Sequence, residues 1–440
     1  MPVPIILPRA DHKISRKDID SEALKVLYRL HEHHYVAYLV GGSVRDLLLG
    51  RRPKDFDIGT DAHPYQIKKL FRNCWIIGRR FRLAHVKFGP KTIEVATFRR
   101  VVPEPASDTP DGEPDTRPVV AASVPEGADQ GMIHRDNTFG TPEEDAFRRD
   151  FTINGLFYDI ATFSVIDYVG GLEDLDKRVV RSIGDPRVRF VEDPVRMIRA
   201  IVMASRLGFD LDLLVTEAIA EHRELIAQAS PARLLEEYYK ILRSGCAEAT
   251  FRALGRARLL ELITPELRHP PEALWDTLAR LDSYRQQFPS APPELTNTML
   301  IGALLIPTGL LEKRAPTSAR DPHGDRINFG ILPIARRDME RLRHILQMVP
   351  RLIDAALPPR VARGIMHRPA FPDTLLWLEI FSDVPEQVEQ WKQASQAKAH
   401  APDAGPDNDP LQPDEIPTGP PRRRRRRRRR GRSSPRPENT

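Results

Sequence analysis

The sequence predicts an α+β protein with a mixed α/β head, an all-helical neck and body, and a disordered basic tail. Three observations lead to this prediction. Residues 92–98 place Ile93, Val95 and Thr97 on alternate positions, which is the period of a β-strand. From Pro186 onward, apolar residues recur at helical spacing between proline-rich joints. After about residue 398, a proline-rich acidic linker leads into arginines, and this composition cannot build a core.

Composition limits the class of protein. The chain has 440 residues, too many for one core, and two or three domains are expected. Its two cysteines cannot form a disulfide framework or a cysteine-rich metal site. No apolar run approaches the ~20 residues that span a bilayer, and the N-terminus lacks the basic start of a signal peptide. We therefore expect a soluble, cytoplasmic protein without a membrane span.

The positive charge is concentrated at the C-terminus. The net charge is +6; residues 421–440 hold eleven arginines and one glutamate, a contribution of +10, so residues 1–420 sum to −4. Nine of these arginines are consecutive, from Arg422 to Arg430. Such a run cannot fold alone, and we expect it to bind RNA without sequence preference and with a steep salt dependence. A lipid surface or a ribosomal contact is the competing interpretation.

The first part of the chain alternates helical and strand-like segments. Helices are expected at residues 20–35 and 63–73 and strands at 74–77 and 92–98. The sequence IIGRRFRLAHVKFG predicts a strand pair hinged near Gly78. Residues 101–131 are rich in proline, glycine and acidic residues, which predicts a mobile loop inserted into the sheet.

The second part is helical almost throughout. A helix is expected between Pro194, in its first turn, and Gly208, which ends it. Further helices are expected at residues 213–228, 230–245, 247–268, 272–287, 293–306, 334–348 and 372–396. The predicted domains are a catalytic head at 1–165, a neck at 166–245, a body at 246–397, and a linker and tail at 398–440.

Asp55 and Asp57 are the first candidates for chemistry. Residues two apart on a strand point to the same face, and two close carboxylates repel unless cations lie between them. This is the arrangement of a two-metal phosphoryl-transfer site, for which Mg²⁺ is well suited. Glu94, on a separate strand, could supply a third oxygen ligand or a base. A solvated surface turn is the alternative, but the preceding glycine turn and helix favour the metal site.

Gly41 and Gly42 precede that helix and are candidates for phosphate binding. Glycines at a helix start leave backbone N–H groups uncovered, and the helix dipole favours an anion such as a triphosphate. Arg45, one turn into the helix, can reach the same anion. A plain tight turn with a surface arginine is an equal alternative from the glycines alone.

The segment RRDFTINGLFYD contributes further candidates. Arg148 and Arg149 could grip a triphosphate or a sugar, while Asp150 could orient them or join the catalytic acids. A helix-capping ion pair is the competing interpretation. Asn154 could cap a turn or hydrogen-bond a ribose, and the local sequence leaves both open.

Asp193, Arg196 and Arg199 lie along one side of the expected helix. An aspartate beside an arginine can match the Watson–Crick edge of adenine by accepting from its amino group and donating to its ring nitrogen. An ordinary surface ion pair is the stronger alternative for an isolated helix.

The remaining candidates concern RNA. Arg79, Arg80 and His85 could contact RNA, although a structural role is more common for such a histidine. Three aromatic residues are expected to lie in the core or half in it, with base stacking as the minority interpretation; they are Trp75, Tyr238 and Tyr239.

Together these segments resemble the superfamily of bacterial poly(A) polymerases and CCA-adding tRNA nucleotidyltransferases, of the class with an all-helical C-terminal half. LVGGSVRDLLLGRRPKDFDI, RRDFTINGLFYD and EDPVRMIRA match its head and neck motifs in order and spacing, and the resemblance covers about residues 35–245 closely. IIGRRFRLAHVKFG, IEVATFRR, RDNTFGTPEEDAFRRDFT and the basic tail look like the poly(A) polymerase branch.

The resemblance implies roles for individual residues. Asp55 and Asp57 would bind magnesium, with Asp150 as a further catalytic acid. Gly42, Arg45 and Arg149 would hold the triphosphate, and Asp193 with Arg196 would read the incoming base. One position departs from the pattern, because Val202 stands where the family's neck helix often carries another arginine.

The predicted function is template-independent addition of AMP from ATP to RNA 3′ ends, with pyrophosphate release and a role in RNA processing or decay. Expected partners are ATP, two Mg²⁺ ions and RNA, with RNA-decay machinery as a candidate and a monomeric state. CCA addition to tRNA is the alternative activity. An RNA-binding adaptor with an inactive transferase head is the alternative from another class.

Overall fold

The computed structural model describes residues 3–78, 82–100, 139–311, 329–354 and 358–399. Residues 1–389 form one compact unit, and residues 390–440 form a second unit of which only the C-terminal part of a helix is described. The predicted loop at 101–131, the arginine pair Arg79–Arg80 and the arginine-rich tail lie outside the described residues.

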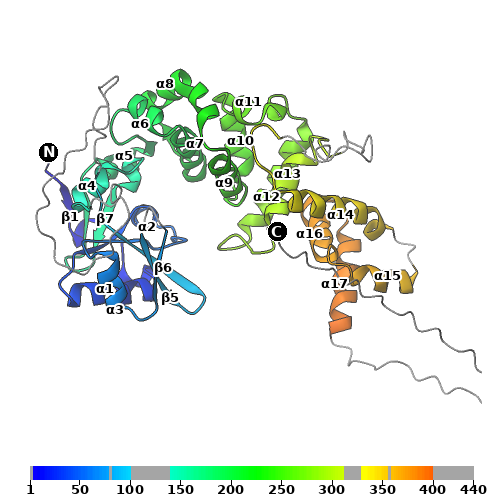
Figure 1. Ribbon diagram of the computed structural model, residues 1–440, viewed down its shortest axis with the longest axis horizontal. Helices are drawn as coiled ribbons and strands as arrows, with labels where there is room; N and C mark the ends of the chain where they lie inside the picture. Colours follow the sequence, from blue (N-terminus) through cyan, green and yellow to red (C-terminus); the bar gives the residue numbers. More distant parts are fainter. Residues whose placement is uncertain (1–2, 79–81, 101–138, 312–328, 355–357, 400–440) are drawn as a thin grey trace, which may run out of the picture. The chain divides into compact units, whose positions relative to one another are not determined.

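Eight strands form a mixed sheet in the order β1-β8-β7-β2-β3-β6-β5-β4 (Figure 1). Their bounds are β1 Ile5–Leu7, β2 Ala37–Val40, β3 Ile58–Thr60, β4 Cys74–Ile77, β5 Leu83–Phe88, β6 Lys91–Thr97, β7 Leu156–Asp159 and β8 Ser164–Asp167. Strands β3 and β6 pair in parallel, and the other neighbours in this sheet are antiparallel. Strands β9 (Val179–Val180) and β10 (Asp210–Leu211) form a separate parallel pair.

The two faces of the sheet are covered unequally. One face packs against α1 (Ser21–Glu32) and α3 (Pro64–Leu70), as Figure 1 shows, and buries alternate residues such as Leu39, Val86 and Val95. The opposite face carries a smaller cluster around Val40 and Phe157, covered by Ala146 of α4 (Pro142–Phe147). Because side chains alternate across a strand, these two cores lie on opposite sides of the same strands.

Local sequence explains why the head elements form where they do. Helix α1 begins after Asp20, whose carboxylate accepts from the N–H groups of Glu22 and Ala23. Strand β4 occupies the predicted positions, and β6 lies within a residue of its predicted position. The expected pairing of strands on either side of Gly78 is confirmed, since β4 and β5 are antiparallel neighbours.

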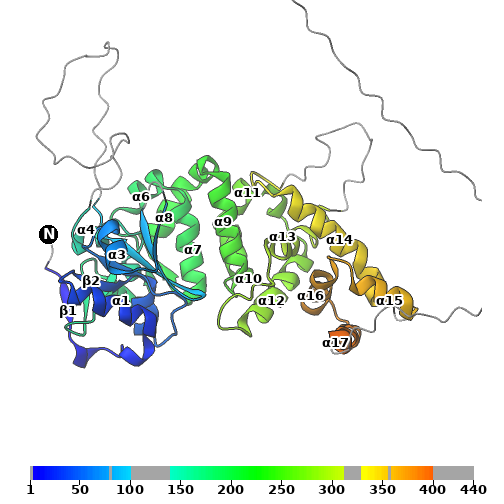
Figure 2. The ribbon, with the colours of Figure 1, turned by 60° about the horizontal axis from the view of Figure 1, so that its bottom comes forward.

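The other described elements are helices (Figures 1 and 2). The bounds are α2 Gly42–Leu48, α5 Gly171–Lys177, α6 Pro186–Glu192, α7 Val195–Leu207, α8 Leu213–His222, α9 Pro231–Leu242, α10 Ala247–Arg256, α11 Leu260–Ile263, α12 Glu272–Gln286, α13 Asn297–Leu305, α14 Arg336–Ile353, α15 Pro359–Met366, α16 Phe371–Phe381 and α17 Pro385–Ala399. Short 3₁₀ helices lie at η1 Arg9–Asp11, η2 Arg16–Asp18, η3 Thr152–Asn154, η4 Arg223–Gln228 and η5 Pro265–Leu267.

Three of the predicted helices are not continuous α-helices. The helix expected at 213–228 ends as α8 at His222 and continues as the 3₁₀ helix η4. The helix expected at 247–268 is divided into α10, α11 and η5, because Arg258 has a left-handed backbone (φ 57°) and Pro265 opens a new turn. The helix expected at 372–396 is divided into α16 and α17 at Ser382, which is extended, and Pro385 starts the second helix. The helix between Pro194 and Gly208 is confirmed as α7.

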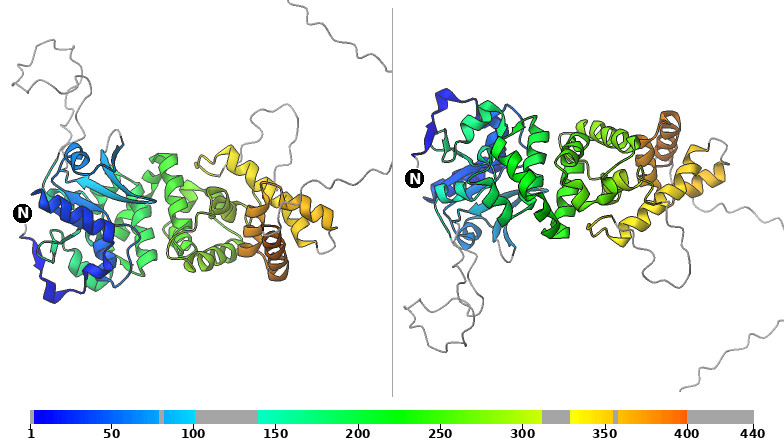
Figure 3. Two further views of the ribbon diagram at one scale, coloured as in Figure 1. Left: turned by 90° about the horizontal axis from the view of Figure 1, so that it is seen from below. Right: turned by 90° about the horizontal axis from the view of Figure 1, so that it is seen from above.

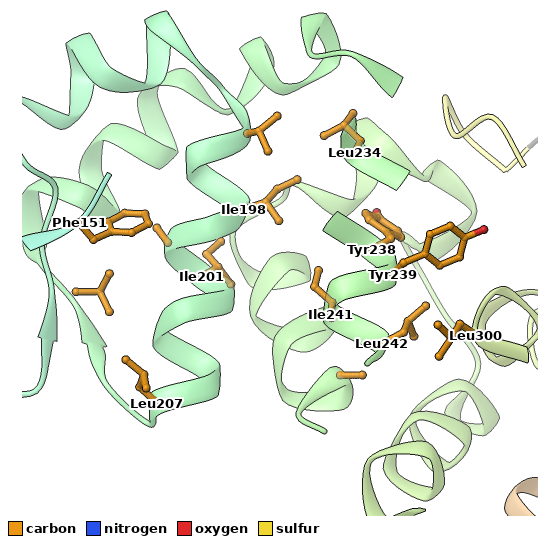
Figure 4. Close-up of a cluster of buried hydrophobic side chains, with 14 of the residues drawn as sticks. Phe151, Ile198, Ile201, Leu207, Leu234, Tyr238, Tyr239, Ile241, Leu242 and Leu300 are labelled. Carbon is orange, nitrogen blue, oxygen red and sulfur yellow. The ribbon is translucent and has the colours of Figure 1, made fainter. Parts of the chain in front are cut away.

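The helical core is built on α7 and α9, which pack side by side (Figures 3 and 4). Ile198 and Ile201 of α7 lie toward Leu234 and Ile241 of α9 in Figure 4. Tyr238 is fully buried as predicted, and its hydroxyl shares a 2.9 Å hydrogen bond with that of Thr264. Helix α7 thus buries one side in the helical core and leaves another side for the polar contacts described below.

No helix in the described ranges combines the length and the apolarity that a bilayer crossing requires.

Candidate functional site

The turn between β2 and α2 positions the first part of the site. Gly41 has a left-handed backbone (φ 72°) that favours glycine. Its N–H donates to the Leu156 carbonyl at 3.1 Å, so the expectation that this N–H is uncovered is wrong. A Cβ at Gly41 would lie only 2.8 Å from Nη1 of Arg149. The glycine therefore allows an arginine to lie directly against the turn.

Asp55 and Asp57 precede β3 instead of lying within it. The Asp57 carbonyl nonetheless accepts from the Val40 N–H at 3.1 Å, which continues the pairing between β2 and β3. Both residues are exposed, and Lys54 lies 3.6 Å from the Asp55 carboxylate. The expected pairing of the two carboxylates thus depends on an extended segment at the start of β3.

The sheet register places Glu94 beside Asp57. Ile58 of β3 pairs with Val95 of β6, so the preceding residues, Asp57 and Glu94, are neighbours across the two strands. Glu94 also lies 3.7 Å from the imidazole of His85 on β5. Desolvation by surrounding protein, then the negative charges of Glu94 and Asp55, raise the pKa of Asp57 from 3.8 to about 6. Asp57 keeps an accessible side chain despite this environment.

These carboxylates fit a hard divalent cation. A cation between them would relieve the repulsion that raises the pKa of Asp57. Within the described ranges, no cluster of three or more His, Cys, Asp or Glu side chains could enclose a metal ion. Mg²⁺ requires less, because it binds through one or two carboxylates and takes its other ligands from water and substrate phosphates.

Arg149 provides positive charge next to the carboxylates. Its guanidinium donates to the Asp145 carboxylate at 3.0 Å and to the Asn154 carbonyl at 3.3 Å, and it lies over the Phe157 ring. The charge of Arg149 lowers the pKa of Asp57, which opposes the effect of Glu94 and Asp55. Arg149 is thus fixed between the glycine turn and the acidic group.

Arg45 has a different environment from the one its motif suggests. Its side chain is buried, with 2% of the residue exposed. It donates to the Asp46 carboxylate at 2.7 and 2.9 Å and to the side chain of Asn154. Burial lowers the pKa of the Arg45 guanidinium. Arg45 thus connects α2 to the segment that holds Arg149. The sequence suggested a phosphate ligand or a surface arginine, and neither interpretation includes this internal contact.

Asp150 lies against the neck helix. Its carboxylate is 3.0 Å from Nε of Arg196 and 2.7 Å from Nη1 of Arg199. Of the two roles considered for Asp150, this contact supports orientation of arginines, although the arginines are those of α7. Val202, at the position where the family's neck helix often carries an arginine, is half-buried against the hydrophobic core.

Asp193 and Arg196 do not pair with each other through their side chains in the described contacts. The Asp193 carboxylate accepts from Arg233 of α9 at 2.7 Å, whereas Arg196 donates to Asp150, to Glu192 and to a backbone carbonyl. The i, i+3 ion pair considered from the sequence is therefore not the contact that Asp193 makes. The two residues still lie at the same end of α7.

Three residues that support this site were missed by the sequence interpretation. Asp145 is buried and holds both Arg148 and Arg149. Its spacing of three and four residues before these arginines is the available signal. Arg189 donates to the carbonyls of Arg148 and Arg149, both at 2.9 Å. The contacts of Arg189 and Arg233 connect distant segments, and no local pattern indicates them.

A mixed sheet with a glycine turn and two aspartates at the start of an inner strand, followed by a helical region, defines a nucleotidyltransferase-type head. Residues 37–181 match the family model of the poly(A) polymerase head domain. Residues 208–269 match the model described as "Probable RNA and SrmB- binding site of polymerase A". The chain therefore contains a poly(A) polymerase head domain, and it is similar to poly(A) polymerases and to CCA-adding enzymes.

Relatives from both branches are similar to the chain. Poly(A) polymerase I of Salmonella typhimurium is 50% identical over 262 residues, which are 60% of this chain and 54% of that protein. The CCA-adding enzyme of Bacillus subtilis is 35% identical over 296 residues, or 67% of this chain and 66% of that enzyme. The match thus spans about half the length of the polymerase relative.

A solved structure shares the fold. The Bacillus stearothermophilus CCA-adding enzyme in complex with CTP superposes with a TM-score of 0.59 and 25% identity, and the match covers 86% of this chain and 82% of that one.

The contact between Gly41 and Arg149 can be tested by substitution. We expect Gly41→Ala to lower Tm, because the left-handed backbone costs about 1–3 kcal/mol for other residues, and to weaken ATP binding by displacing Arg149. Gly50→Ala is a matched control, since Gly50 has φ 68° and no atom within 4 Å of an added Cβ. Differential scanning fluorimetry and calorimetric ATP titration measure both effects. Equal loss of ATP affinity in both variants would contradict the role of Arg149.

Proposed function

We propose that this chain is a template-independent poly(A) polymerase that transfers AMP from ATP to RNA 3′ ends. The observation that carries the proposal is the carboxylate pair Asp55–Asp57 beside the turn that holds Arg149, in a head similar to that of poly(A) polymerases. The 50% identity to a poly(A) polymerase I, against 35% to a CCA-adding enzyme, favours polymerisation of adenylate. RNA-decay machinery as a partner, a monomeric state and a cytoplasmic location belong to this proposal.

The reaction joins two substrates at the acidic group. The 3′-hydroxyl of RNA attacks the α-phosphorus of ATP, a phosphodiester bond forms, pyrophosphate departs, and the hydroxyl proton passes to solvent. Asp55 and Asp57 would hold Mg²⁺, which when bound supplies positive charge to the reacting phosphate. Glu94 and Asp150 are the two candidates for a third catalytic acid, and the contacts of Asp150 with Arg196 and Arg199 favour a positioning role for it.

Some residues would contact the triphosphate directly, and others would hold those residues in position. Arg149 is partly accessible next to Asp57 and would contact phosphate, with the turn Gly41–Gly42 allowing close approach. Arg45 is buried, and its contacts with Asp46 and Asn154 would hold the turn and the segment of Arg149 together. Asn154 would thereby act through its carbonyl contact to Arg149.

The neck would recognise the base. Asp193 lies between α6 and α7, and its pairing with Arg233 is solvent-exposed, so an adenine amino group can replace Arg233 at small cost. Arg196 and Arg199 would donate to the base or to phosphate. In the proposed division of the chain, residues 1–165 catalyse, 166–245 bind the nucleotide, 246–397 contact RNA, and 398–440 anchor it.

The substrate assay tests the function directly. We expect purified protein to extend a generic RNA with ATP in Mg²⁺ and to give long A-tails on a denaturing gel. Efficient CTP incorporation on tRNA ending without CCA, with no A-tail growth, would favour the CCA-adding alternative. Replacing both Asp55 and Asp57 by Ala should abolish tailing and leave RNA affinity intact. Absence of activity in the wild type with intact RNA binding would favour the adaptor.

Replacement of Asp57 by Asn should have opposite effects on the stability of the fold and on activity. The pKa of Asp57 is raised from 3.8 to about 6 in the folded protein. Ionisation of Asp57 therefore lowers the free energy of unfolding as pH rises between these two values, and above pH ~6 this loss of stability is complete. We expect Asp57→Asn to raise Tm at pH 8 but not at pH 4, and to abolish activity. Mg²⁺ should raise Tm of the wild type and not of the variant. Asp176→Asn, an exposed position on α5, is the control; an identical Mg²⁺ response in Asp57→Asn would contradict the metal site.

Base recognition predicts a change in nucleotide preference. Loss of a hydrogen bond to a charged group costs about 1.5–3 kcal/mol, so Asp193→Asn should reduce kcat/KM for ATP by roughly 10- to 150-fold and have less effect on CTP. Arg233→Gln removes the partner of Asp193 and leaves its carboxylate in place, so the ATP to CTP ratio should stay unchanged. If both variants alter the ratio equally, Asp193 has only a structural role.

A further inference from the structure

Within the part of the chain that the structure describes, the outer half of the sheet has an uncovered face on strands β4, β5 and β6. On one side of these strands, Cys74, Val86 and Val95 are buried beneath helices. On the other side, the cluster under α4 extends only to Phe98. The side chains that alternate with the buried ones are exposed or half-buried; they are Trp75, Ile77, His85, Lys87, Thr92 and Glu94.

The register places a row of these residues in line with the carboxylates. Trp75 pairs with His85, and His85 pairs with Glu94. Asp57, the residue directly before β3, continues the row, because Ile58 of β3 pairs with Val95 of β6. Cross-strand partners share a face, and neighbouring strands lie about 4.8 Å apart. Trp75 is thus three strand spacings from Asp57, roughly 15 Å, on one continuous surface.

Trp75 is exposed, which contradicts the expectation that it lies in or half in the core. Half of its surface (50%) is accessible, and 47% of the neighbouring Ile77 is accessible as well. The ammonium group of Lys87 lies 5.1 Å from the centre of the indole ring. A large aromatic ring kept in solvent beside a lysine is a feature of surfaces that bind single-stranded nucleic acid.

We propose that Trp75 is a stacking platform for a base of single-stranded RNA upstream of the reacting 3′ end, with Lys87 facing the adjacent phosphate. This inference rests on the proposed function, because that function places the 3′-hydroxyl at Asp57. RNA entering along the row from β4 to β3 meets a ring, then His85, then the carboxylates.

The surface favours RNA over a protein partner for two reasons. The surface extends to the carboxylates, and under the proposed function the RNA 3′ end reacts there. It also combines one aromatic ring with a cation, as sequence-tolerant binding of single strands requires. A second copy of the chain that pairs with the edge strand β4 is the competing occupant, and the test separates the two.

Binding of a fluorescein-labelled decamer of adenylate, without ATP or Mg²⁺, tests the platform. Stacking of one base contributes about 1–3 kcal/mol, so Trp75→Ala should weaken binding by roughly 5- to 150-fold, and Trp75→Phe should retain most of the affinity. Tyr65→Ala is the matched control, because Tyr65 is an exposed aromatic residue on α3, which packs against the opposite face. In steady-state assays, KM for RNA should rise in Trp75→Ala while kcat and ATP affinity stay unchanged.

Any of three binding results would overturn the proposal: unchanged decamer affinity in Trp75→Ala, an equal loss of decamer affinity in Tyr65→Ala, or an equal loss of ATP affinity in Trp75→Ala. A change in sedimentation mass without a change in RNA affinity would also overturn it and assign the face to contact between copies. Thermal melts of Trp75→Phe establish that the fold is retained. If the wild type adds no AMP to RNA but Trp75→Ala still loses decamer affinity, the proposed function fails and the RNA platform stands.

Discussion

The repulsion among carboxylates at the start of β3 is the constraint on which the site depends. Desolvation is the largest cause of the raised pKa of Asp57, and the charges of Glu94 and Asp55 add to it and bring the value to about 6. A fold that keeps them together loses stability unless positive charge is nearby. Arg149 provides part of it, and a divalent cation would provide the rest. Such stored repulsion is expected where a protein is built to bind a cation together with its substrate.

The position of Arg149 is in turn determined by several elements. Asp145 of α4 holds the guanidinium, and Arg189 of α6 holds the backbone carbonyls of Arg148 and Arg149. Gly41 leaves the space that the guanidinium fills. A half-buried arginine that several partners hold depends on each of them for its position. Helix α6 and the head are thus joined around the segment of Arg149, and the position of α6 is coupled to that of the glycine turn.

The fold was largely predictable from the sequence, and the errors in the prediction have physical causes. Periodicity and caps identified α1, β4 and α7, because these elements are decided by their own residues. The breaks at Arg258 and Ser382 were missed, since they arise from backbone conformations that apolar spacing does not reveal.

The sequence predicted the residues of the candidate site better than the contacts that these residues make. The motifs name Asp57, Arg149 and Asp150, and the folded chain places the charge of Arg149 near Asp57 and the carboxylate of Asp150 against Arg196 of α7. They do not show that the Gly41 N–H is already bonded or that Arg45 is buried, because both depend on Leu156, Asp46 and Asn154 from the folded chain. Partner choice among arginines is set by tertiary packing, and spacing alone cannot determine it.

The unequal covering of the sheet links these observations. Where α4 packs on the face around Phe157, the sheet is closed and Arg149 is fixed above it. Where that cover ends, the same face continues outward through Glu94 and His85 to Trp75. The carboxylates therefore lie at the border between a closed half and an open half. A triphosphate held by the closed half and a single strand on the open half would meet at that border, which is the geometry that joining the two substrates requires.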